Sequence, residues 1–123
     1  MTWTITELAE EFDVTPRTIR HYEDVGLLSP ERRGTSRVFR ARDRVRLALV
    51  LRGRRLGFSL EQIATIVNMY DEQPGEAGQL QYLIERIAIR RAELEQRRRD
   101  IDETLAELVA VEQRCQQDLA ELS

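Results

Sequence analysis

The segment from Thr15 to Glu23, T-P-R-T-I-R-H-Y-E, carries the residue types best suited to bind a nucleic acid. Thr15 can cap a helix, and Pro16 fits its first turn, where a missing N–H costs nothing. Ile19 is the apolar residue left to hold this helix to its support. Guanidinium, hydroxyl and imidazole groups on the other side can contact phosphates and base edges. The candidate DNA contacts here are Thr15, Arg17, Thr18, Arg20, His21 and Tyr22.

A second helix must support this one. Thr4 and Glu7 have the spacing of a capping box. The helix that follows would turn Ile5, Leu8, Ala9 and Phe12 inward. Only a short break, at Asp13-Val14, separates the two helices, as a helix-turn-helix requires.

A small β wing is expected after the helix that begins at Thr15. Gly26 can form its left-handed cap, and Pro30 prevents continuation. After a polar turn, the alternation over residues 37–40 would place Val38 on one side of a strand and the arginines on the other. The candidate DNA contacts in the wing are Arg37, Phe39 and Arg40. Arg37 could also be a solvated strand residue, and Phe39 could pack in the core of the wing.

Two further helices are expected, from Asp43 to about Arg55 and from Ser59 to about Tyr70. Gly57 separates them, and Ser59 with Gln62 repeats the capping-box spacing.

The charge distribution supports DNA contact by this region. The chain has a net charge of −3, yet residues 14–55 contain 12 arginines and 4 carboxylates, a net charge of +8. From Asp71 onward, 7 arginines and 13 carboxylates give −6. Neutralising phosphates supplies most of the sequence-independent affinity for DNA. The basic segment therefore coincides with the expected DNA-contacting elements.

The C-terminal part carries an apolar stripe at sevenfold spacing. A helix of about 45 residues would be roughly 65 Å long, so one small domain cannot bury the stripe, and a second copy of the chain is its simplest partner. In a parallel pair Arg90 and Arg97 would face their own copies, which favours antiparallel pairing. The candidate dimerisation residues are Leu80, Ile87, Leu94, Ile101, Leu108, Cys115 and Leu122.

Other classes of function find little support. One histidine and one cysteine give no metal-ligand or catalytic spacing, so neither an enzyme nor a cofactor is expected. Cys115 stands alone in the stripe, where a small apolar residue is more common than a reactive thiol. No apolar run is long enough to cross a membrane, and no signal-peptide pattern is present, so we expect a cytoplasmic, nucleoid-associated protein.

Over residues 3–71 the chain resembles the MerR family of bacterial transcription regulators. The resemblance lies in T-P-R-T-I-R-H-Y-E-D-V-G-L-L-S-P, in the wing S-R-V-F, and in R-G-R-R-L-G-F-S-L-E-Q-I. It implies a mainly α fold with a winged helix-turn-helix head, residues 1–71, a linker, 72–78, and a coiled-coil dimerisation helix, 79–123. The family resemblance also implies an antiparallel homodimer on a pseudo-palindromic promoter site.

The resemblance further implies how such a dimer acts. Family members bend and untwist the promoter spacer for RNA polymerase. The run from Arg42 to Ile63 is similar to a subgroup that controls branched-chain amino-acid and fatty-acid breakdown, which implies a small organic metabolite as effector. A second hypothesis is a coiled-coil adaptor whose head binds protein, and the +8 segment argues against it.

Overall fold

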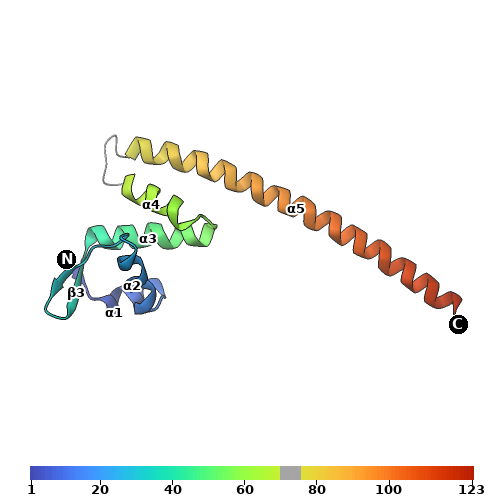
Figure 1. Cartoon of the computed structure of the whole chain (residues 1–123), viewed down its shortest axis with the longest axis horizontal. Coiled ribbons are helices and arrows are strands. Elements are labelled where there is room, and N and C mark those ends of the chain that lie inside the picture. Colours follow the sequence, from blue (N-terminus) through green and yellow to red (C-terminus); the bar gives the residue numbers. More distant parts are fainter. Residues whose placement is uncertain (70–75) are drawn as a thin grey trace. The chain divides into compact units, whose positions relative to one another are not determined.

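The computed structural model describes residues 1–69 and 76–123 and divides into two compact units, Met1–Leu83 and Ile84–Ser123. The first unit contains three short strands and four helices, followed by the start of a fifth helix that continues into the second unit (Figure 1). The expectation of a mainly α fold with a small wing and a long C-terminal helix is confirmed. The elements are β1 (Thr2–Trp3), α1 (Ile5–Phe12), α2 (Pro16–Asp24), β2 (Glu31–Arg33), β3 (Ser36–Arg40), α3 (Ala41–Leu56), α4 (Leu60–Met69) and α5 (Glu76–Glu121).

The helix-turn-helix begins and ends where its capping residues require. The Thr4 backbone N–H donates to Glu7 Oε1 at 2.8 Å, and the Glu7 N–H donates to Thr4 Oγ1 at 3.1 Å. Asp13 closes α1 in the left-handed conformation, with φ of 54°. The Thr15 hydroxyl then accepts the Thr18 N–H at 3.2 Å and starts α2. These local bonds satisfy donors that a helix terminus otherwise leaves without partners.

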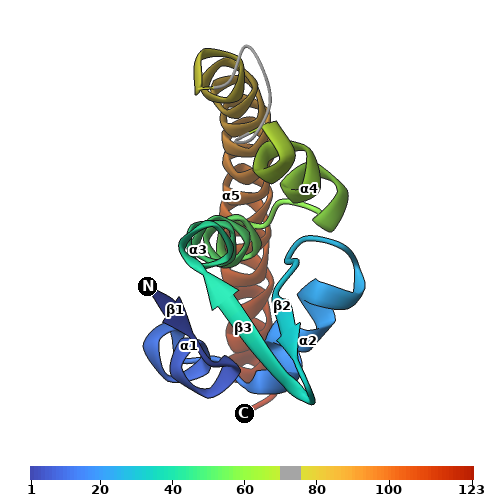
Figure 2. The ribbon, with the colours of Figure 1, turned by 90° about the vertical axis from the view of Figure 1, so that its left-hand side faces the viewer.

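The wing, which consists of β2, β3 and the turn between them, belongs to a sheet of three antiparallel strands in the order β1-β3-β2 (Figure 2). Strand β1 pairs Trp3 with Phe39, and β2 pairs Arg32 with Arg37. The sequence did not predict β1, because two residues are too few for an alternating pattern and their partner lies far along the chain.

The faces of β3 differ from the expectation. Phe39 is fully buried, whereas Val38 is only half-buried. Because alternate residues of a strand point to opposite faces, Arg37 shares the inward side with Phe39, and Arg40 shares the outward side with Val38. The prediction that the arginines lie together opposite Val38 is therefore wrong.

The core of the first unit draws on all four of its complete helices and on β3. Ile19 and Tyr22 fix α2 to this core, and Leu27 and Leu28 follow from the segment after it. The buried hydrophobic residues of the cluster are Leu8, Ala9, Ile19, Tyr22, Leu27, Leu28, Phe39, Leu47, Val50, Phe58, Ile63 and Val67.

A buried arginine links three parts of this unit. Arg46 on α3 is 4% exposed. Its Nε donates to the Leu27 carbonyl at 2.7 Å, its Nη1 to the Val67 carbonyl at 3.3 Å, and its Nη2 to Asn68 Oδ1 at 3.0 Å. One guanidinium thus binds the end of the helix-turn-helix and the last turn of α4. Arg46 is one of the 12 arginines of the +8 segment, and the sequence pattern did not predict its burial.

A second arginine of α3 packs on aromatic rings. The Arg44 guanidinium lies 5.5 Å from the ring centroid of Trp3 and 5.9 Å from that of Phe12. Its Nε also donates to Glu11 Oε1 at 3.1 Å, and this hydrogen bond raises the pKa of Arg44. The cation therefore ties β1 and α1 to α3.

Helices α3 and α4 approach closely at a glycine. A Cβ atom built on Gly53 would lie 2.8 Å from Ile63 Cγ1, so only glycine fits without movement. Gly57 ends α3 with φ of 89°. The Ser59 N–H donates to Gln62 Oε1 at 3.0 Å, which confirms the predicted capping box. The end of α4 expected near Tyr70 lies outside the described residues, and the described part of the helix ends at Met69.

Helix α5 begins earlier than expected. Most of the expected linker, 72–78, lies outside the described residues, but residues 76–78 form the first turn of α5. The Gln79 side chain, 8% exposed, donates from Nε2 to the Ile66 carbonyl at 2.8 Å. This contact holds the start of α5 against α4 and extends the compact unit to Leu83.

Candidate nucleic-acid interface

The exposed face of α2 is cationic. Arg17, Arg20 and His21 are exposed, while Ile19 and Tyr22 on the other side are buried. Thr15 is exposed at the N-terminus, where free N–H groups and the helix dipole favour an anion. The helix can therefore present charged groups to phosphates and bases while its other face holds it in place.

Two expected DNA contacts occupy the core. Phe39 is fully buried, so its ring cannot stack on a base. It packs in the core, the preferred alternative for this residue, and its place among the candidate DNA contacts is corrected. Tyr22 is 7% exposed, and its ring packs in the hydrophobic cluster. Thr18 is half-buried, and its hydroxyl lies 3.0 Å from that of Thr15. Fewer of the expected DNA-contact side chains are therefore exposed to solvent than the sequence indicated.

The wing arginines form ion pairs. Arg37 Nε donates to Glu23 Oε1 at 2.5 Å, and Arg32 Nη2 donates to Glu23 Oε2 at 3.1 Å. Arg40 Nη2 donates to Glu31 Oε2 at 2.5 Å across the strand pair, and this bond lowers the pKa of Glu31. Arg37 and Arg40 were both predicted to contact DNA, but their carboxylate partners were not predicted from the sequence. Glu23 is one of only four carboxylates in the strongly basic segment 14–55, and that scarcity was the signal that could have drawn attention to it.

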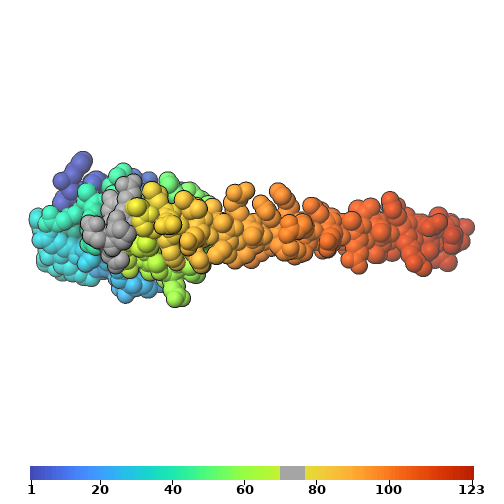
Figure 3. Space-filling view, turned by 90° about the horizontal axis from the view of Figure 1, so that it is seen from above, coloured from blue at the N-terminus to red at the C-terminus, as the bar shows by residue number. Residues whose placement is uncertain are grey.

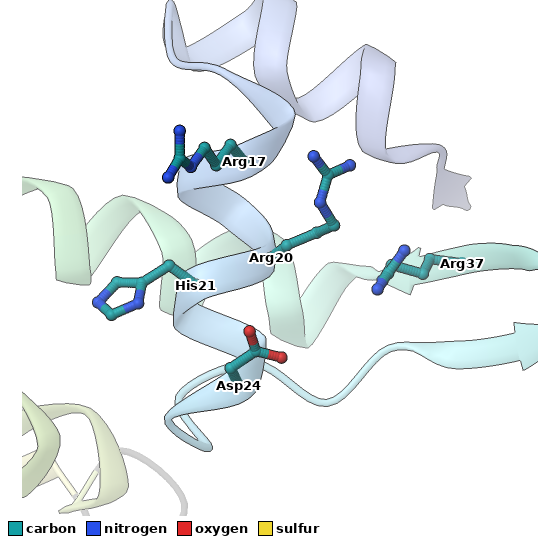
Figure 4. Close-up of a pocket in the computed structure, with 5 residues that line it drawn as sticks. All are labelled: Arg17, Arg20, His21, Asp24 and Arg37. Carbon is teal, nitrogen blue, oxygen red and sulfur yellow. The ribbon is translucent and has the colours of Figure 1, made fainter.

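A hollow of about 300 Å³ opens between α2 and the wing. Figure 4 shows Arg20 and Arg37 on the same side of α2, whereas Arg17 and His21 project to the other side. Three arginines and one carboxylate give the lining a net charge of +2. The lining residues are Arg17, Arg20, His21, Asp24 and Arg37.

The stripe along α5 forms a second candidate surface. Its apolar side chains are between 41% exposed, at Ile87, and 85% exposed, at Leu122. The space-filling view shows the later turns of this helix uncovered on the face presented (Figure 3). The thiol of Cys115 is also exposed. Leu80, Ile87, Leu94, Ile101, Leu108, Cys115 and Leu122, the residues expected to mediate dimerisation, are all exposed in the single chain.

The described ranges contain neither a metal-binding cluster nor a membrane-spanning helix. Within residues 1–69 and 76–123, no three His, Cys, Asp or Glu side chains are grouped so that they could hold a metal ion. Within the same ranges, no helix is long and apolar enough to span a membrane.

Comparison with protein-family models gives two matches. A model described as MerR HTH family regulatory protein matches residues 3–70, and one described as MerR, DNA binding matches residues 44–111. Together they cover the helix-turn-helix, the wing, α3, α4 and most of α5.

Curated relatives include regulators of similar sequence. The HTH-type transcriptional regulator HmrR of Rhizobium leguminosarum bv. viciae is 39% identical over 70 residues, which are 56% of this chain and 54% of that protein. The HTH-type transcriptional regulator CueR of Escherichia coli O6:H1 is 28% identical over 117 residues, covering 93% of this chain and 84% of that protein. The chain spans about half the length of the first curated relatives that it matches.

Solved structures share the fold. A MerR-family transcriptional regulator from Bacillus cereus has a TM-score of 0.68 and 26% identity, covering 86% of this chain and 76% of that one. The regulator PbrR691 from Ralstonia metallidurans CH34, solved in complex with lead(II), has a TM-score of 0.63 and 26% identity, covering 82% of this chain and 81% of that one.

Proposed function

Because the chain belongs to the MerR family of helix-turn-helix regulatory proteins, we propose that it is a transcriptional regulator that binds promoter DNA as a homodimer. The observation that carries this proposal is the exposed cationic face of α2, with Arg17, Arg20 and His21, held by buried Ile19. A helix of this kind, anchored on one face and charged on the other, fits the major groove.

The side chains of α2 and those of the wing suit different contacts with DNA. Arg17, Arg20 and His21 on α2 bind base edges and nearby phosphates, and the N-terminus of α2 at Thr15 adds backbone donors. Arg37 and Arg40 bind flanking backbone. Contacts to phosphates set the position of the protein, whereas contacts to base edges give sequence specificity.

The second copy of the chain is proposed from the stripe on α5. Large apolar side chains at 41–85% exposure favour burial, and an identical stripe is their simplest complement. Antiparallel pairing separates Arg90 and Arg97 from their own copies. It also brings them nearer the acidic residues that follow Asp100 on the partner helix.

A dimer of this kind would place two α2 helices in successive major grooves of a pseudo-palindrome. Bending and untwisting the promoter spacer costs on the order of 1–6 kcal/mol, which the flanking wing contacts must offset. This distortion is the proposed route by which the protein acts on RNA polymerase, in the cytoplasm. For the effector, the resemblance to a catabolic subgroup leads us to propose a small organic metabolite.

The test is genome-wide capture of bound DNA, followed by binding to the best site at several salt concentrations. We expect a pseudo-palindrome between promoter elements, bound by a dimer with an affinity that falls steeply with salt. The genes beside that site would then nominate the effector. Absence of an enriched site, together with a stable complex with another protein, would favour the adaptor hypothesis instead.

A further inference from the structure

Glu23 is a carboxylate at the centre of the basic surface. It lies in the last turn of α2, and its side chain is 15% exposed. Both of its oxygens accept hydrogen bonds from the wing, Oε1 from Arg37 and Oε2 from Arg32. The carboxylate therefore joins the DNA-contacting helix to the wing through two ion pairs.

The register of the wing explains why a carboxylate is needed here. Arg32 and Arg37 are directly opposite each other in the β2–β3 pair. Like charges at opposed positions destabilise a strand pair. Glu23 gives each guanidinium its own oxygen, and so permits two arginines at this point of the wing.

The geometry of the Arg37 bond matters for what this arginine can bind. Glu23 is bound by Nε, the nitrogen nearest the stem, so the two terminal Nη groups extend past the carboxylate. Arg37 lines the hollow beside Arg20, whereas Glu23 is not among the lining residues. Figure 4 shows the Arg37 and Arg20 guanidinium groups on the same side of α2.

We propose that Glu23 is a positioning residue for DNA binding, which holds Arg37 so that Arg37 and Arg20 together receive one backbone phosphate in this hollow. The inference rests on the proposed function, since it assumes that the head binds DNA. A long side chain that is already ordered loses less freedom on binding. The Asp24 carboxylate at the rim opposes an anion, but the three arginines of the lining outweigh it.

Simple electrostatics predicts the opposite effect, which makes the proposal testable. Removing a negative charge from a basic surface should strengthen binding to DNA. If Glu23 positions Arg37, its removal should weaken binding instead. Glu31 offers a matched control, because its ion pair with Arg40 lies outside the hollow lining and is solvent-exposed, with side chains 46% and 60% exposed against 15% and 19% for Glu23 and Arg37. An exposed pair of this kind contributes little to holding Arg40 in place.

The experiment measures the binding of the full chain to a duplex of about 30 base pairs of random sequence, long enough for two half-sites, because phosphate contacts do not depend on sequence. The variants are Glu23→Gln, Arg37→Ala, the double variant, and Glu31→Gln. We expect Glu23→Gln to weaken binding about three- to tenfold, and Glu31→Gln to bind at least as tightly as the wild type. Arg37→Ala should lower the slope of log affinity against log salt by about 2, because the dimer loses one phosphate contact in each half-site.

The double variant separates positioning from general structural support. Because Glu23 acts through Arg37, Glu23→Gln should cause no further loss in the Arg37→Ala background. An equal loss in both backgrounds, or tighter binding by Glu23→Gln, would overturn the inference while leaving the proposed function intact. Failure of the wild-type chain to bind the duplex at low salt would overturn both. Thermal unfolding of each variant checks that the fold is retained.

Discussion

Replacing Arg46 by methionine should destabilise the first compact unit. Among the described residues, the guanidinium donates to the Leu27 and Val67 carbonyls and to Asn68 Oδ1, and Arg46 is 4% exposed. A hydrogen bond from a charged donor contributes about 1.5–3 kcal/mol, and a buried acceptor left unpaired costs about 1–3 kcal/mol. Methionine keeps the aliphatic stem and avoids the cost of burying a charge, which offsets part of this loss. We therefore expect a net loss of about 2–4 kcal/mol, less than the sum of the three bonds.

Native-state hydrogen exchange of the α3 and α4 amides measures this free energy region by region. Arg54→Met, an exposed change on the same helix, is the control and should stay within about 0.5 kcal/mol of the wild type. If Arg46→Met lowered the opening free energy no more than Arg54→Met, the three hydrogen bonds would not stabilise the unit, and the reasoning would be refuted.

Three further predictions concern packing, DNA contact and the thiol. Gly53→Ala places a Cβ 2.8 Å from Ile63 Cγ1, and overpacking should lower the free energy of unfolding, measured in urea, by about 1–3 kcal/mol; a stabilised variant would show that α3 and α4 separate easily. Arg20→Ala should weaken operator binding about tenfold or more, with the dimer mass unchanged in ultracentrifugation; unaltered affinity would remove Arg20 from the DNA-contacting face. Cys115→Ser should leave DNA binding and its response to oxidants unchanged, because a lone thiol in an apolar stripe serves packing. Loss of an oxidant-dependent mobility shift in this variant would contradict that assignment.

The local structure of the head could be predicted from sequence because short-range chemistry determines it. Thr4 with Glu7 and Ser59 with Gln62 form the hydrogen bonds that their spacing predicts. Gly26 takes the left-handed conformation predicted for it after the DNA-contacting helix, with φ of 84°. Strand β1 escaped prediction because its two residues derive their structure from a partner in β3, not from their own pattern.

The sequence predicted the basic surface of the candidate site but not the partners that its arginines bind. Composition identified a basic segment, and the motif identified which helix carries the exposed arginines. Neither showed which arginine turns inward, because the acceptors that Arg46 and Arg37 bind lie on distant segments of the chain. Likewise, Phe39 stood both among the candidate DNA contacts and as a wing-core residue, because the face of a strand depends on its register, which a four-residue alternation does not fix.

The packing of Trp3 against Arg44 gives the protein a selective optical probe. Trp3 is the one tryptophan of the chain, and it lies in β1, paired with the fully buried Phe39. About half of the far-ultraviolet circular dichroism of the chain will come from the 46 residues of α5, and the rest mainly from the helices of the head. Tryptophan emission, in contrast, will change when β1 leaves the sheet and the indole loses its neighbours. Recording the two signals during one melt would therefore separate the unfolding of the DNA-contacting head from the melting of the long helix, without any added label.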